Sequence, residues 1–104
     1  MSKYKIVIPS SIIEFKDYYY FRWLYLRKPL NQKLGTEKDS FESKSIHKMI
    51  IYENKIIAVG RVHKILKSKY QIRYFAVHKN FRNKNIGSLL MESLETEIRN
   101  KGGK

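Results

Sequence analysis

The segment from Phe75 to Met91 constrains the fold more than any other part of the chain. An apolar β-strand pattern ends near His78, a short turn rich in Asn and basic residues follows, and the amphipathic pattern of a helix begins at Ile86. The first N–H groups of a helix lack partners within the helix and carry partial positive charge. Placed beside Arg82 and Lys84, they predict a binding site for phosphate or pyrophosphate.

The residues before this segment predict a strand, a helix and a long loop. The pattern of residues 4–8 is that of an edge strand, ended by Pro9. Apolar residues at helical spacing predict a helix over residues 11–28, with Ser11 and Glu14 as a capping box and Pro29 at its end. Residues 30–45 are polar and predict a loop, of a length that is usually functional.

The second half of the chain predicts an antiparallel meander followed by a helix. Three strand patterns are separated by the short polar turns 53–55 and 67–69, and they cover residues 46–52, 56–66 and 70–78. The apolar stripe of a helix then runs from about residue 86 to 100 and ends at Gly102. The sequence therefore predicts an α+β fold with a mainly antiparallel sheet flanked by helices.

Composition limits the functional classes that remain. A chain of 104 residues with 42% hydrophobic residues predicts one folded domain over residues 1–104. The absence of cysteine excludes disulfides, a thiol nucleophile and thiolate metal sites, and it fits a reducing cytoplasm. No apolar run is long enough to cross a bilayer. The three histidines show no metal-ligand spacing with carboxylates, so no metal site is predicted.

The formal charge of +13 leaves two interpretations open. A basic chain with eight tyrosines is compatible with a non-catalytic module that binds RNA or DNA. The lysines are nevertheless scattered along the chain and form no block of about five or six like charges, which favours an ordinary solvated surface.

The turn after His78 resembles the acetyl-coenzyme A signature of the GNAT superfamily of N-acetyltransferases. That signature is a strand ending in Val, then Arg/Gln-x-x-Gly-x-Gly/Ala; here Gly87 is the last glycine, and Asn85 stands at the first glycine position. Asn tolerates the left-handed backbone conformation for which Gly is favoured. The resemblance implies that acetyl-coenzyme A is bound by Phe75, Ala76, Val77, Arg82, Asn83, Lys84, Asn85, Ile86, Gly87 and Ser88.

The resemblance also implies an architecture and an association state. Residues 71–77 are similar to the central strand of the family, and residues 21–30 with 35–39 resemble the first helix and substrate-side loop of one bacterial subgroup. The chain aligns with the N-terminal half of a GNAT fold and stops after the helix that follows the phosphate loop. We therefore expect an open strand edge beside residues 70–78 and a homodimer, or a separate polypeptide, covering it. The helix stripe expected to be partly uncovered is Leu89, Leu90, Leu94 and Ile98.

The activity implied is acetyl transfer to an amine, from a small molecule or a peptide, whose identity the sequence does not give. We expect the acceptor near Glu37, Arg61 and Arg73. By strand alternation, Arg61 should point to the same face as Val59, and Arg73 to the same face as Phe75. The two arginines either bind an anionic or carbonyl group of the substrate, or they pair with Glu53 or extend into solvent. No general base or acid is assigned by motif. A catalytically inactive remnant of the family is the remaining alternative.

Overall fold

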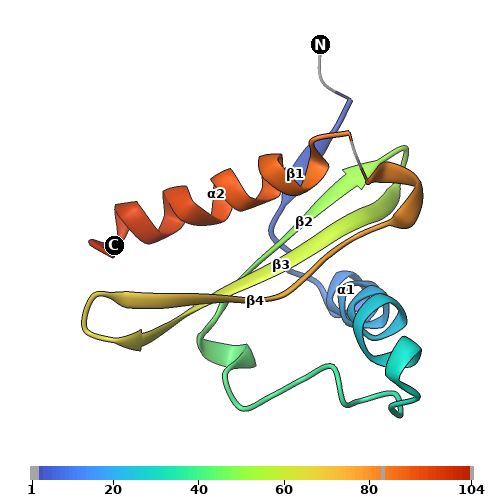
Figure 1. Cartoon of the computed structure of the whole chain (residues 1–104), viewed down its shortest axis with the longest axis horizontal. Coiled ribbons are helices and arrows are strands. Elements are labelled where there is room, and N and C mark those ends of the chain that lie inside the picture. Colours follow the sequence, from blue (N-terminus) through green and yellow to red (C-terminus); the bar gives the residue numbers. More distant parts are fainter. Residues whose placement is uncertain (1–2, 83, 104) are drawn as a thin grey trace.

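The computed structural model describes residues 3–82 and 84–103, and these residues form an antiparallel four-stranded sheet with the strand order β1-β2-β3-β4 (Figure 1). The predicted α+β class with a mainly antiparallel sheet is confirmed. The predicted strands are also present, and no strand end differs from its predicted position by more than one residue. Their bounds are β1 Lys5–Val7, β2 Ile46–Tyr52, β3 Lys55–Leu66 and β4 Lys69–Val77.

Two helices flank the sheet, as the apolar spacing predicted. Helix α1 spans Ile12–Arg22 and continues as a π-helical turn, Trp23–Arg27, and a 3-10 turn, Lys28–Leu30. Asn31, with φ of 59°, ends this segment in the left-handed conformation. Helix α2 spans Ile86–Asn100. No helix in the described part of the chain is long and apolar enough to cross a membrane.

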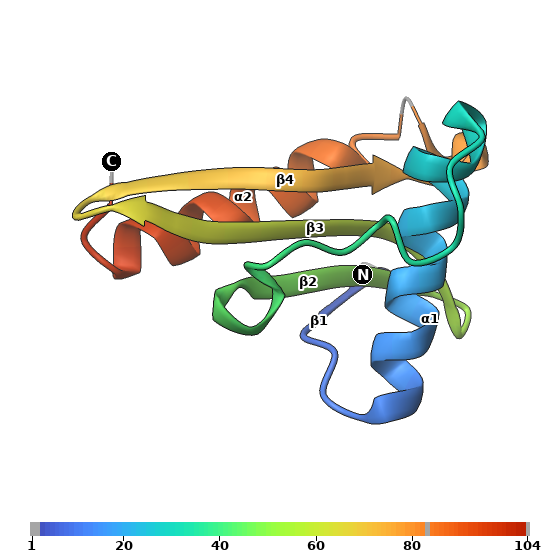
Figure 2. The same cartoon turned by 90° about the horizontal axis from the view of Figure 1, so that it is seen from below.

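Helices α1 and α2 lie on opposite faces of the sheet (Figures 1 and 2). One hydrophobic cluster joins the α2 side chains Leu90 and Leu94 to Val62, and the other joins Tyr18 and Phe21 of α1 to the sheet. Leu90 and Leu94 are fully buried, so the expectation that this stripe would be only partly covered is wrong for them. Leu89 and Ile98 are partly buried.

The β2–β3 hairpin is closed by a two-residue turn. Tyr52 pairs with Lys55, and the intervening Glu53 and Asn54 have φ of 50° and 63°. Two consecutive residues with positive φ give the turn a twist that matches the twist of the two strands. The hairpin therefore fixes the register of β3, the strand that carries Arg61.

A β-bulge interrupts the pairing of β3 with β4. Val59 pairs with Ala76 and Arg61 with Arg73, so Tyr74 and Phe75 together oppose Gly60. Tyr74 takes a positive φ of 55° to accommodate the extra residue. A Cβ at Gly60 would lie 2.9 Å from Leu94 Cδ1, so glycine lets α2 approach the sheet at this point.

The bulge changes the faces to which the β4 side chains point. Phe75 packs in the cluster beneath α2, whereas Arg73 reaches Asp39 on the opposite face. The predicted shared parity of Arg73 and Phe75 is therefore wrong, because strand alternation is lost where the bulge inserts one residue. The shared face of Val59 and Arg61, which precede and follow Gly60 on the regular strand, is retained.

The start of α1 provides a test of the local sequence signals. Ser11 Oγ accepts a hydrogen bond from the Glu14 N–H at 3.0 Å, and Glu14 Oε1 accepts from the Ser11 N–H at 3.1 Å. We expect Ser11→Ala to lower the free energy of unfolding by about 1 kcal/mol, because the helix loses its N-cap acceptor. Denaturant unfolding measures this. Ser68→Ala, in the β3–β4 turn, is the control and should change stability by less than about 0.5 kcal/mol; an equal loss for both variants would contradict the role of the cap.

Candidate functional site

The loop between β4 and α2 leaves the backbone of the strand end accessible. His78 N–H donates to the Ile57 carbonyl of β3 at 2.7 Å, so the neighbouring Val77 N–H and C=O point away from β3. Arg82 Nε donates to the Val77 carbonyl at 3.2 Å. This hydrogen bond holds the Arg82 guanidinium at the end of β4, beside the first turn of α2.

The first turn of α2 presents backbone donors to a surface hollow. Asn85 precedes the helix with φ of 62°, the left-handed conformation that its place in the signature predicts, and its side chain makes no capping hydrogen bond. The N–H groups that open the helix therefore remain available to a ligand. The hollow is lined by Val77, Arg82, Asn85, Ile86, Gly87 and Ser88.

This hollow fits a diphosphate. It combines helix N–H groups, the positive end of the α2 dipole and an arginine, which are the donors that such an anion requires. Gly87 packs its backbone close to the strand, since an added Cβ would lie 3.7 Å from Phe75 and from Val77. Lys84 lies at the same loop, with Nζ 5.7 Å from the centre of the Phe81 ring. Asn83 lies outside the described residues.

The hollow continues as a groove along α2 and β4. A second depression shares Gly87 and Ser88 with the first and adds Phe75, Met91 and Glu92. A third shares Glu95 with the second and extends to Tyr70 and Ile98. The predicted cofactor residues that line these depressions are Phe75, Val77, Arg82, Asn85, Ile86, Gly87 and Ser88. Ala76 lines none of them, and its side chain is buried in the cluster on the α1 face.

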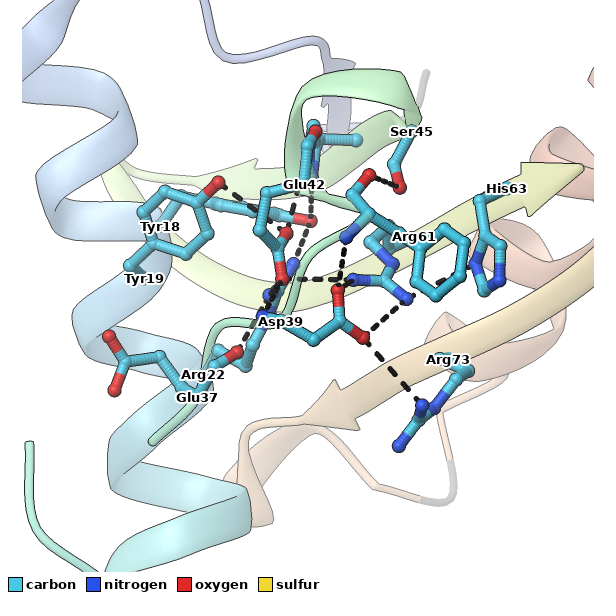
Figure 3. Close-up of polar contacts among 12 residues, drawn as sticks. Tyr18, Tyr19, Arg22, Glu37, Asp39, Glu42, Ser45, Arg61, His63 and Arg73 are labelled. Carbon is cyan, nitrogen blue, oxygen red and sulfur yellow. Dashed lines mark hydrogen bonds and ion pairs between the residues drawn. The ribbon is translucent and has the colours of Figure 1, made fainter. Parts of the chain in front are cut away.

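On the α1 face of the sheet, a network of ion pairs fastens the loop of residues 31–45 (Figure 3). Asp39 binds Arg61 through two hydrogen bonds, from Nη1 to Oδ1 at 2.6 Å and from Nη2 to Oδ2 at 3.1 Å. Glu42 Oε2 accepts from Nη1 of Arg61 and Nη1 of Arg22, each at 2.9 Å, and from the Asp39 N–H at 2.9 Å. Arg22 and Arg61 are fully buried. The loop is thus held to the sheet by charged groups removed from water.

Two histidines take fixed roles in this network. His47 Nε2 donates to the Glu42 carbonyl at 2.8 Å, which leaves Nδ1 to accept from the Tyr18 hydroxyl at 2.9 Å. His63 Nδ1 accepts from Arg61 Nη2 at 3.1 Å, and its ring stacks on Phe41. Burial lowers the pKa of each histidine below its ordinary value, and Arg61 lowers the pKa of His63 further. Neutral rings therefore suit these hydrogen bonds. The described residues contain no group of His, Cys, Asp and Glu side chains that could hold a metal ion.

The structure brings only two of the three predicted acceptor residues together. Arg61 and Arg73 face each other across β3 and β4 and share Asp39, whereas neither pairs with Glu53. The Glu37 carboxylate points away from them (Figure 3), and its Oε1 accepts from the Gly35 N–H at 2.7 Å. Arg73 is the accessible member, with 47% of its side chain exposed.

Sequence reasoning missed Tyr74, which lies at the centre of the cluster. Three guanidinium carbons approach its ring, at 4.4 Å for Arg22, 4.9 Å for Arg61 and 5.0 Å for Arg73. The available signal was an aromatic residue directly after Arg73 on the strand, which the bulge alone turns into a contact with all three cations.

Comparisons with known proteins identify the family and the fold of this chain. Residues 12–104 match the acetyltransferase (GNAT) family. The fold is similar to that of an aminoglycoside 6'-N-acetyltransferase crystallised with coenzyme A, with a TM-score of 0.78 and 13% identity over 95% of this chain and 57% of that chain. It is also similar to a GNAT family acetyltransferase from Elizabethkingia anophelis with acetyl-CoA bound, with a TM-score of 0.70 and 17% identity over 100% of this chain and 63% of that chain.

A third similar structure is an acetyltransferase of the GNAT family from Staphylococcus aureus Mu50. Its TM-score is 0.75 and its identity 14%, over 95% of this chain and 68% of that chain. The chain thus spans between 57% and 68% of the length of these three proteins. The described groove and ion-pair network lie within the matched part.

The ion pair of Asp39 predicts a pH dependence of stability. Hydrogen bonds from Arg61 lower the pKa of Asp39 from 3.8 to about 2. Because the pKa in the folded state lies below that of the unfolded chain, the ionised carboxylate stabilises the fold above about pH 4, and this contribution is lost as the pH falls towards 2. We expect Asp39→Asn to lower the free energy of unfolding at pH 7 by about 1 kcal/mol, allowing for solvent screening of a partly exposed group.

The two proteins should then converge in stability between about pH 4 and pH 2. Thermal or denaturant unfolding across that range measures the difference. Asp17→Asn, at an exposed position of α1, is the control and should parallel the wild type at every pH. A constant gap between the wild type and Asp39→Asn down to pH 2 would contradict the ion-pair explanation.

Proposed function

Because the chain belongs to the GNAT family of acetyltransferases, we propose that it binds acetyl-coenzyme A in the groove between β4 and α2 and transfers the acetyl group to an amine. The observation that carries this proposal is the strand end, left-handed Asn85 and open helix start arranged around one hollow. The thioester supplies an activated acetyl group, which passes to the amine nitrogen while the amine loses a proton and the thiol leaves.

Each part of the loop has a role in binding. We assign the diphosphate to the N–H groups of Ile86, Gly87 and Ser88, with Arg82 and Lys84 supplying positive charge. We assign the amide-containing arm of the cofactor to the backbone of the strand from Phe75 to Val77, where the N–H and C=O of Val77 point away from β3. Asn83 stays in the predicted set from the sequence alone.

We place the acceptor on the α1 face, beside the loop of residues 31–45. Arg61 holds the loop there through Asp39, and Glu37 holds it through its backbone carbonyl, which accepts a hydrogen bond from Arg22. Arg73 offers the accessible guanidinium. The chain needs to position the amine and exclude water, since positioning alone accounts for much of the rate in such a reaction. The general base and acid are unassigned. A cytoplasmic location remains our expectation from the absence of cysteine.

Calorimetric titration with acetyl-coenzyme A tests the cofactor site. We expect binding by the wild type, and about tenfold weaker binding by Arg82→Ala, because a charge-assisted contact to phosphate is worth about 1.5–3 kcal/mol. Asn85→Gly should bind at least as tightly as the wild type, because glycine takes positive φ without strain, whereas Asn85→Ala should bind more weakly.

Lys64→Ala, on the same sheet but outside the loop, is the matched control for loss of one positive charge and should bind as the wild type does. A folded sample that produces no heat at millimolar acetyl-coenzyme A would contradict the proposal. Steeply salt-dependent binding of an oligonucleotide, unaffected by Arg82→Ala, would instead support the basic nucleic-acid module.

We further propose that the chain forms a homodimer through the first part of β4, residues 69–73, outside the stretch assigned to the cofactor. In the described sheet β4 pairs only with β3, and its outer edge runs beside the half-buried side chains Tyr70, Ile72 and Ile98. An unpaired edge next to apolar surface favours association. Sedimentation velocity at low micromolar concentration should give the mass of a dimer; a folded monomer under these conditions would contradict this proposal without affecting the cofactor site.

A further inference from the structure

We propose that the acceptor amine carries a carboxylate or phosphate group and that Arg73 binds this group. This inference rests on the proposed acetyl transfer, and it assigns the substrate class that the sequence leaves open. It follows from the position of Arg73 on the strand, the balance of charge around it and the way its guanidinium is held.

Arg73 lies close in the chain to the stretch that we assign to the cofactor. It is the last paired residue before the bulge, and the cofactor-binding stretch that begins at Phe75 follows two residues later. The bulge directs Phe75 towards α2 and Arg73 to the opposite face. A group bound by Arg73 is therefore separated from the α2 groove by the thickness of one strand.

The charges around Arg73 leave one cation without a full partner. The guanidinium groups of Arg22, Arg61 and Arg73 face the carboxylates of Asp39 and Glu42. Each carboxylate already makes contacts of 3.1 Å or less with a buried arginine, whereas the Nη1 of Arg73 lies 3.6 Å from Asp39 Oδ2. His63, the other titratable group in contact with Arg61, accepts a hydrogen bond and adds no negative charge. An anion bound by Arg73 would neutralise the remaining positive charge of this cluster.

The Arg73 head group is also oriented in advance. Its guanidinium carbon lies 5.0 Å from the centre of the Tyr74 ring, and its Nη1 lies 3.6 Å from Asp39 Oδ2. A planar guanidinium held in this way offers paired N–H donors to a carboxylate or phosphate. Because 47% of the side chain remains exposed, the group is accessible from solvent. An acceptor bearing extra positive charge at this place would be repelled.

Matched pairs of amines test this inference. With acetyl-coenzyme A saturating, acetyl transfer is measured for β-alanine against β-alaninamide and for phosphoethanolamine against ethanolamine. The wild type should favour the anionic member, and Arg73→Gln should reduce that preference about 10- to 100-fold. Because the intrinsic reactivity of each amine is the same for every variant, the change in the ratio isolates the contribution of Arg73. A response in one pair only would distinguish a carboxylate from a phosphate acceptor.

Two further variants separate a specific contact from general charge. Arg73→Lys should keep part of the preference, because it keeps the charge but loses the paired donors. Lys64→Gln removes one positive charge from exposed surface of β3 and should leave the ratio unchanged. An equal ratio for the wild type and Arg73→Gln would overturn the inference, as would an equal effect of Lys64→Gln.

Binding is measured independently of turnover. In the presence of coenzyme A, the 15N resonance of Arg73 Nε should shift on titration with β-alanine or phosphoethanolamine and not with β-alaninamide or ethanolamine. No shift at millimolar concentrations of either anionic amine would overturn the inference even if no transfer is detected. Absence of coenzyme A binding would contradict the proposed function alone, because the resonance still reports whether Arg73 binds the anion.

Discussion

The β-bulge at Tyr74 is the constraint on which the rest of the site depends. One extra residue opposite Gly60 reverses the alternation of β4, so that Phe75 packs beneath α2 while Arg73 joins the charged network on the other face. The positive φ of Tyr74 costs about 1–3 kcal/mol for a bulky residue. Its ring is surrounded by three guanidinium groups, and these contacts offset part of that cost.

The same cations hold the long loop on the sheet. Burying Arg22 and Arg61 is unfavourable unless carboxylates accompany them, and the loop supplies Asp39 and Glu42 for this purpose. Among the described residues, the Nε atoms of Arg22 and Arg61 are buried without a hydrogen-bond acceptor. Loss of either carboxylate would therefore leave a buried arginine with still fewer partners. The loop is fastened in one position, which a site for a second substrate requires.

Strand β4 separates the two halves of the proposed reaction. Its outer edge and the start of α2 border the groove that we propose for the cofactor, and its α1 face carries Arg73 and faces the fastened loop. Both proposed sites border the same strand, so an amine held beside Arg73 lies close to the stretch assigned to the cofactor. The hydrogen bond from Arg82 to the Val77 carbonyl links the end of the groove that we propose for the diphosphate to the strand.

Local sequence signals determined the strands, the helices, the Ser11 cap and the left-handed Asn85 of the loop before α2, because each depends on residues close together in the chain. The partners of Arg61 and Arg73 could not be predicted in this way. Asp39 lies 22 residues before Arg61, and the bulge that directs Arg73 towards it arises from the pairing of β3 with β4 around Gly60. Only the tertiary structure decided which charges meet, because strand register and helix packing, and not local propensity, set the face of each side chain.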